Sequence, residues 1–203
     1  MMQDFSNEKY LKAQFYQVDG KYERLEESHR QIDIDFKEIE KYLANINNVL
    51  DIGCFDGYFL SKIDCELKFG LDINLVNIDK CQDRGIPSLV CDIRYGLPEF
   101  IDEFDFINFR HTLEHIPRHK QKKVMADICS RLSDNGVLSV IIPIENLKEM
   151  TYKHPGMFSS VSQFVRLVPL NFRILRKKKI KKFDDSDNAN YLFIICRKNF
   201  TGR

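Results

Sequence analysis

Hydrophobic positions along the chain change their spacing near residue 45. Before it, apolar residues recur three or four positions apart and so define one face of a helix: Ile32, Phe36, Ile39 and Leu43. Beyond it, short apolar runs alternate with polar or amphipathic segments of helix length. We therefore predict two parts, a helical N-terminal cap or lid at residues 1–45 and one domain at residues 46–200.

The alternation beyond residue 45 is typical of parallel βαβ units with helices on both faces of a sheet. Five apolar runs are predicted to be parallel strands: Val49–Ile52, Leu67–Leu71, Ser88–Cys91, Phe104–Phe109 and Val137–Ile142. Helices are expected between them at Tyr58–Ile63, Asn74–Arg84 and Pro117–Leu132. Gly136 is expected to stop the helix before the fifth strand.

The end of the chain departs from this alternation. A helix is predicted over Phe158–Val168, ended by Pro169. Two strand-like runs follow, Phe172–Phe183 and Tyr191–Cys196, joined by a short, turn-rich connector. Because the connector is too short for a crossover helix, these runs should form an antiparallel hairpin.

Composition limits the classes of function. Basic and acidic residues nearly cancel, giving a formal charge of +1, so no global field draws the protein to nucleic acid or an anionic membrane. None of the six cysteines forms a C-x-x-C pair, which argues against a zinc knuckle or thioredoxin-like motif. The first residues lack a signal-peptide pattern, and no apolar run approaches the ~20 residues that span a bilayer. We expect a cytoplasmic protein with its cysteines reduced.

Glycine and acidic residues follow the predicted strands. The segment VLDIGCFDG places Asp51, Gly53 and Gly57 around the end of the first strand, while Asp72 and Asp92 end the next two. In open α/β sheets, ligands bind beyond the carboxyl ends of the strands, and glycine lets the backbone approach them. A carboxylate such as Asp72 can accept both hydrogen bonds of a ribose diol, and Asp92 can accept one from an adenine amino group. The pattern favours a nucleoside cofactor.

The segments VLDIGCFDG, LDI, VCDI, FDFINFRHTLEHI and NGVLSVIIP occur in the order and spacing of the class I methyltransferases, over about residues 47–143. The closing hairpin agrees with the sixth and seventh strands of that family. The chain thus resembles a class I S-adenosylmethionine-dependent methyltransferase of the small-molecule type, with an LEH segment after the fourth strand. The resemblance implies an α/β, Rossmann-like, doubly wound, mostly parallel seven-stranded sheet with an antiparallel C-terminal hairpin and a helical N-terminal cap.

The resemblance also implies the cofactor, S-adenosyl-L-methionine, and its product, S-adenosyl-L-homocysteine. Carried over by position, the cofactor-binding residues are Asp51, Gly53, Cys54, Phe55, Gly57, Asp72, Ile73, Asp92, Ile93, Phe109 and Arg110. Phe55 departs from the family, which often has glycine there, so we expect a slightly different loop geometry. A dehydrogenase needs that glycine to make room for a pyrophosphate, so Phe55 favours S-adenosylmethionine over NAD.

A His-Glu-His cluster follows the fourth strand, at His111, Glu114 and His115. Methyl transfer requires alignment of the acceptor with the sulfonium and often removal of a proton. Histidine titrates near neutral pH, so His111 and His115 are the predicted catalytic residues. In one alternative, Glu114 and His115 only hydrogen-bond the loop; in another, the three residues bind a divalent metal. Pro117 and the preceding strand argue against the H-x-x-E-H helix of a zinc peptidase.

The acceptor side is predicted from the resemblance and from loop position. His154 follows the fifth strand, and Tyr16, Tyr22 and Arg24 in the N-terminal helices are candidate lid residues. The alternatives are a solvated loop histidine and simple packing against the sheet. The expected reaction is methylation of oxygen, in preference to nitrogen, on a small polar acceptor such as a sugar or biosynthetic intermediate. A non-catalytic cofactor-binding subunit, an RNA-directed methyltransferase and a nicotinamide-dependent reductase are the competing readings.

The run Arg173–Lys182 holds seven basic residues in ten. We interpret it as a solvated edge strand that resists sheet-to-sheet aggregation. The alternative is contact with a phosphorylated acceptor, a nucleic acid or a membrane surface. Since the chain has no RNA-binding module and no evident aromatic–basic groove, no nucleic-acid partner is expected.

Overall fold

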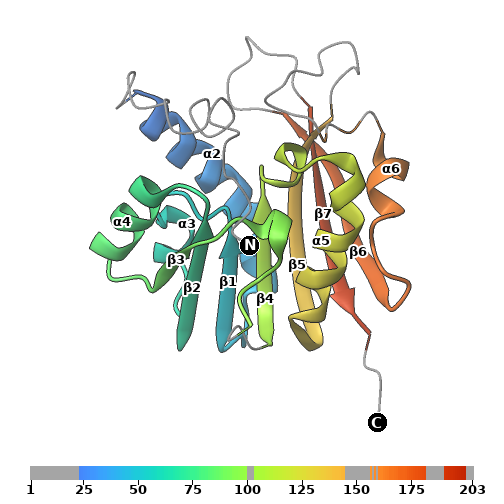
Figure 1. The fold of residues 1–203 in the computed structure, drawn as a ribbon, viewed down its shortest axis with the longest axis horizontal. Coiled ribbons are helices and arrows are strands. Elements are labelled where there is room, and N and C mark those ends of the chain that lie inside the picture. The colour runs from blue at the N-terminus through green and yellow to red at the C-terminus, as the bar shows by residue number, and fades with distance from the viewer. Residues whose placement is uncertain are drawn as a thin grey trace, which may run out of the picture.

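Helices cover both faces of a mixed β-sheet in the computed structural model of the protein (Figure 1). The structure describes residues 23–99, 103–144, 156, 158, 160–181 and 190–199. Within these ranges, seven strands form one sheet in the order β3-β2-β1-β4-β5-β7-β6. The strands are β1 (Asn48–Ile52), β2 (Leu67–Asp72), β3 (Ser88–Val90), β4 (Phe104–Arg110), β5 (Leu132–Ile144), β6 (Phe172–Lys181) and β7 (Asn190–Lys198).

The helices of the described ranges lie between these strands, apart from one that precedes them. The α-helices are α2 (Glu23–Ile39), α3 (Tyr58–Ser61), α4 (Leu75–Asp83), α5 (Arg118–Ser130) and α6 (Val161–Val165). Three 3-10 turns complete the elements of the described ranges: η2 (Glu40–Tyr42), η3 (Ile93–Tyr95) and η4 (Leu113–His115). None of the described helices is both long and apolar enough to cross a bilayer.

Strand directions confirm the predicted topology. β1 pairs in parallel with β2 and β4, β2 with β3, and β4 with β5. β7 runs antiparallel to both β5 and β6. The chain order therefore reverses between β1 and β4, which is the place where open α/β sheets bind their ligands.

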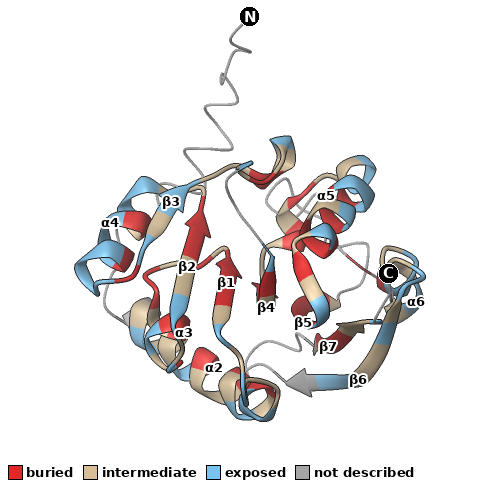
Figure 2. Ribbon diagram, turned by 90° about the horizontal axis from the view of Figure 1, so that it is seen from below, coloured by how far each residue is buried: buried red, intermediate tan, exposed pale blue. Residues whose placement is uncertain are grey.

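The two faces of the sheet bury separate apolar clusters. α2, α3 and α4 cover one face, and α5 and α6 cover the other (Figure 2). Ile32 and Ile39 of α2 are fully buried in the first of these clusters, as the helical spacing predicts. The fold class implied by the sequence is thus confirmed, including the helical N-terminal segment. A boundary at residue 45 stays a prediction.

Local boundaries differ from the predictions in several places. Leu132, predicted to end a helix, is the first residue of β5. α3 is shorter than predicted, and α6 is shorter because Phe158 instead bridges to Ile144 beside the sheet. The expectation for Gly136 is wrong: α5 ends at Ser130, and Gly136 lies inside β5, where the pairing with β4 is irregular. Glycine is required there because a Cβ would lie 2.8 Å from the Ser133 carbonyl oxygen.

Candidate functional site

Loops from adjacent parallel strands meet at the carboxyl ends of β2, β1 and β4 (Figure 1). The Leu71 carbonyl accepts hydrogen bonds from the amides of Gly53, at 2.7 Å, and Cys54, at 2.9 Å. The amide of Phe55 donates to Asp72 Oδ2 at 3.0 Å. The loop after β1 is therefore fixed to the end of β2.

This loop has a left-handed backbone at three positions. Gly53 has φ +77°, Phe55 has φ +52°, and Gly57, the N-cap of α3, has φ +77°. A Cβ on Gly53 would lie 2.1 Å from Thr112 Oγ1, so the loops after β1 and β4 touch across the switch point. Phe55 keeps a conformation that glycine adopts freely and that costs a residue with a side chain about 1 kcal/mol or more.

Asp72 is held by N–H donors on both carboxylate oxygens. Oδ1 accepts hydrogen bonds from the Asn74 amide at 2.8 Å and from Asn77 Nδ2 at 3.3 Å, and Oδ2 accepts one from the Phe55 amide. Burial raises the pKa of Asp72, and hydrogen bonds from the amides of Asn74, Phe55 and Ile73 and from the Asn77 side chain oppose that rise. A carboxylate oxygen can accept more than one hydrogen bond, so a ligand hydroxyl can add to these. The site fits a ligand hydroxyl at this point.

Asp51 supports the loop from inside the fold. It is buried and accepts a 2.8 Å hydrogen bond from Asn108 Nδ2 of the neighbouring strand. Burial raises the pKa of Asp51 to about 7. Cys54, also predicted at the cofactor, has a buried side chain that packs beside Gly70.

Arg110 at the end of β4 pairs with α2. Its Nη1 lies 2.9 Å from Oδ2 of Asp35, which is fully buried and also accepts from Gln31 at 2.9 Å. Burial raises the pKa of Asp35, and the Arg110 charge opposes that rise. This ion pair ties the N-terminal helix to the strand that carries His111.

The other predicted cofactor residues differ in burial and in their contacts. Asp92 forms an ion pair with Arg94, two residues on. Ile93 is buried beside it, and Ile73 is partly exposed. The side chain of Phe109 is fully buried in the core under α5, so only its backbone lies at the strand end.

The predicted catalytic cluster lies directly after β4. His111 has φ +49°, and its amide donates to the Ile141 carbonyl at 2.8 Å. Its ring meets Tyr191 of β7 edge to face, with the ring centres 4.5 Å apart. Glu114 is buried, with Oε1 3.8 Å from His111 Nδ1, and His115 closes η4. The backbone hydrogen bond and the Tyr191 ring therefore hold the His111 imidazole in position.

No cluster of possible metal ligands is found among the described residues. No group of three or more His, Cys, Asp or Glu side chains within them is arranged to hold a metal ion. The alternative in which His111, Glu114 and His115 bind a divalent metal therefore gains no support from this part of the chain.

The side chains of the four predicted acceptor residues lie outside the part of the chain that the structure describes. Tyr16, Tyr22 and His154 lie outside the described residues. Arg24 belongs to the first turn of α2, but its side chain is not among those described.

Sequence reasoning missed a polar cluster around Asp56, inside the glycine loop. Asp56 is buried, and Oδ2 lies 2.8 Å from both His29 Nε2 of α2 and Arg84 Nη2 beyond α4. His29 also stacks on Tyr58, with ring centres 3.9 Å apart. An acidic residue between two loop glycines is the local signal that could have suggested this cluster. The partners come from distant parts of the chain.

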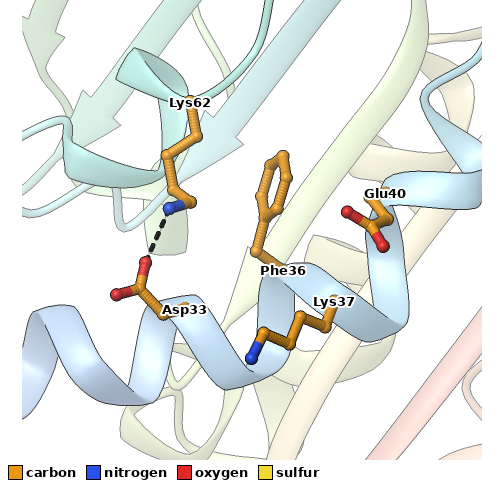
Figure 3. Close-up of a pocket in the computed structure, with 5 residues that line it drawn as sticks. All are labelled: Asp33, Phe36, Lys37, Glu40 and Lys62. Atoms are coloured by element: carbon orange, nitrogen blue, oxygen red, sulfur yellow. Dashed lines mark hydrogen bonds and ion pairs between the residues drawn. The ribbon is translucent and has the colours of Figure 1, made fainter.

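A pocket of about 550 Å³ lies elsewhere, between α2 and the end of α3 (Figure 3). It is lined by Asp33, Phe36, Lys37, Glu40 and Lys62. Asp33 and Lys62 form a 2.6 Å ion pair at its side. Because it shares no residue with the loops at the strand ends, and its polar groups are already paired in part, we do not assign it to the cofactor.

The strand order, the reversal between β1 and β4, and the glycine loop with its acidic neighbours define a class I methyltransferase fold. The sequence profile of a family described as a methyltransferase domain matches residues 10–169, which is more than half of the chain. The protein therefore belongs to this methyltransferase family. No curated protein sequence matches the chain.

Solved structures share the fold at low sequence identity. The N-methyltransferase NodS from Bradyrhizobium japonicum, in complex with S-adenosyl-L-homocysteine, has a TM-score of 0.66 and 17% identity, covering 90% of this chain and 91% of that one. The structure of a DhpI–SAH complex has a TM-score of 0.64 and 17% identity, covering 94% of each chain. The [4+2]-cyclase SpnF has a TM-score of 0.65 and 15% identity, covering 84% of this chain and 80% of that one.

Proposed function

We propose that the protein transfers the methyl group of S-adenosylmethionine to a small polar acceptor, at oxygen in preference to nitrogen. The observation that carries this proposal is the convergence of the Gly53–Gly57 loop, Asp72 and the end of β4 at the switch point of the sheet. Membership of a methyltransferase family supports it. So do the NodS and DhpI structures, which hold S-adenosylhomocysteine.

In this proposal the strand-end loops hold the cofactor. Asp72 would accept hydrogen bonds from the ribose hydroxyls, and Ile73 would pack on the adenine. The backbone from Gly53 to Phe55 would face the methionine part, while Asp51, Cys54 and Asp56 support that loop from within. The bound cofactor supplies an electrophilic methyl group on a sulfonium.

His111 is the proposed base. Glu114 lies on the Nδ1 side of the ring, 3.8 Å away, and would stabilise the imidazolium that forms when the ring takes the proton of an acceptor hydroxyl. The fixed backbone and the Tyr191 ring hold the imidazole in one place. His115 is the second candidate base, on the following turn.

Calorimetry with S-adenosylhomocysteine and with NAD tests the cofactor. The proposal expects binding of the first and none of the second. Asp72→Asn should weaken binding by about tenfold to hundredfold, since it replaces a charged acceptor by a neutral one. Asp79→Asn, on the exposed face of α4, is the matched control and should bind like the wild type. Binding of NAD without S-adenosylhomocysteine would reject the proposal.

Turnover distinguishes an enzyme from a non-catalytic subunit. Release of S-adenosylhomocysteine is measured across a panel of sugar hydroxyl, phenol, amine and RNA acceptors. His111→Ala should lower kcat by about a hundredfold or more while cofactor binding persists, and His115→Ala is run beside it. Cofactor binding without turnover on any acceptor would favour a regulatory subunit, and turnover on RNA alone would favour an RNA-directed enzyme. A loss of activity on chelation would revive the metal alternative.

A further inference from the structure

Basic residues are concentrated at one edge of the sheet. Residues 160–181 and 190–199, which contain α6, β6 and β7, hold nine lysines and arginines and no aspartate or glutamate. The whole chain has a formal charge of +1, so the remaining residues carry −8. The β6–β7 connector, which is part of that remainder, has one lysine and three aspartates. This separation of charge is much stronger than the near-neutral total suggests.

β6 is the outer strand of the sheet, and its basic side chains divide between two sides. Arg176 and Lys178 both pair with Glu38 of α2, at 2.6 and 2.5 Å. Successive residues of a strand point to opposite faces, so Lys177 and Lys179 project away from Glu38. Both are exposed. Arg173, nearer the start of the strand, is also exposed, but its pairing with Arg197 places it on the same side as Arg176. Figure 2 shows this exposure along β6.

Two exposed apolar side chains precede these charges in the chain. Leu170, in the turn between α6 and β6, is fully exposed, and Val165 at the end of α6 is partly exposed. Arg166 and Arg173 lie on either side of Leu170 in the chain. A leucine exposed among arginines is suited to a boundary between apolar and anionic surroundings.

We propose that the α6–β6 edge, formed by Val165, Arg166, Leu170, Lys177 and Lys179, binds the surface of an anionic phospholipid bilayer. The basic side chains attract lipid phosphates, and Leu170 enters the boundary between headgroups and acyl chains. Nucleic acid is a poorer fit because single strands bind through aromatic platforms as well as charge. The exposed aromatic residue among the described large apolar side chains is Tyr95, which follows β3 at the other edge of the sheet.

Co-sedimentation of the full chain with phosphatidylcholine vesicles, with and without phosphatidylglycerol, tests the proposal. Binding is expected only with phosphatidylglycerol and should fall steeply as salt is raised toward ~0.5 M. Lys177→Gln/Lys179→Gln should weaken partitioning about twenty-five-fold, from about fivefold for each lost charge. Leu170→Ser should weaken it by about threefold or more. Lys122→Gln/Lys123→Gln, on exposed positions of α5, is the matched control and should bind like the wild type.

Circular dichroism checks that each variant is folded. Several outcomes overturn the proposal: no binding to anionic vesicles, equal binding without phosphatidylglycerol, or equal loss in the α5 control. Tighter binding of a single-stranded oligonucleotide, measured by anisotropy in the same buffer, would assign the edge to nucleic acid instead. If nothing binds, the lysines serve only to keep the edge strand from pairing with another sheet.

Discussion

Asp51→Asn is expected to change how the stability of the protein depends on pH. Asp51 is buried, and burial raises its pKa from 3.8 to about 7. When the pKa of a carboxyl is higher in the folded protein, the free-energy cost of ionising it is absent below the unfolded pKa. The cost grows as the pH rises and is complete above the folded pKa. Asparagine at this position carries no such cost.

The magnitude follows from the two pKa values of Asp51, 3.8 and about 7. Their difference corresponds to about 4 kcal/mol at high pH, and the part that develops between pH 5 and pH 8 is about 2 to 3 kcal/mol. Asparagine keeps the size of the side chain and an oxygen that can accept from Asn108 Nδ2. It also adds a donor for Asn108 Oδ1, which is buried without a hydrogen bond to any described residue.

Urea denaturation at several pH values from 5 to 8 measures this effect in the wild type and in Asp51→Asn. The free energy of unfolding of the variant, minus that of the wild type, should increase by about 2 to 3 kcal/mol over this range. Burial also raises the pKa values of Asp35 and Asp72. Asp35 is present in both proteins and cancels in the difference, while the Asp72 charge contributes to the raised pKa of Asp51 and so belongs to the measured effect. Asp79→Asn, an exposed position, supplies the baseline. A difference that stays constant from pH 5 to 8 would refute the argument from burial.

Gly53→Ala should destabilise the protein and weaken S-adenosylhomocysteine binding, because its Cβ would lie 2.1 Å from Thr112 Oγ1. Gly85→Ala is the control for backbone strain alone, since Gly85 has φ +73° and an added Cβ would have nothing within 4 Å. Thermal melts measure the loss of stability in both variants. Calorimetry should show weaker S-adenosylhomocysteine binding only for Gly53→Ala. Arg110→Met should lower the free energy of unfolding at pH 8 by about 3 kcal/mol, since it leaves the buried Asp35 carboxylate without its cation. Urea denaturation of Asp35→Asn/Arg110→Met should recover part of this loss, and a double variant less stable than Arg110→Met would contradict the ion-pair argument.

Local features of the chain were sufficient to predict the site's outline. The apolar runs located the strands because a strand buried on both faces is a continuous apolar segment. Gly53 and Gly57 were informative because a left-handed backbone is a local property that favours glycine. Asp72 could be placed at the ligand edge because the carboxyl ends of parallel strands share one side of a sheet.

The supporting contacts were not predictable in this way. Arg110 pairs with Asp35, which is 75 residues away in the chain, and Asp56 contacts His29, which is 27 residues away. Neither pair has a local pattern, since each forms only when α2 packs on the face of the sheet. Gly136 was misassigned because a glycine after asparagine has the same local signature at a helix end as at an irregularity in a strand.

The sequence by itself determined the fold class, the strand-end motif and the resemblance to methyltransferases, because these depend on spacing along the chain. Only the tertiary structure decided which contacts each acidic residue makes. It joins Asp72 to the Phe55 amide of the glycine loop, buries Asp51 beside Asn108 and pairs Asp92 with Arg94. It also decided that Lys177 and Lys179 face away from Glu38, since the direction of a side chain follows from strand pairing and pleat.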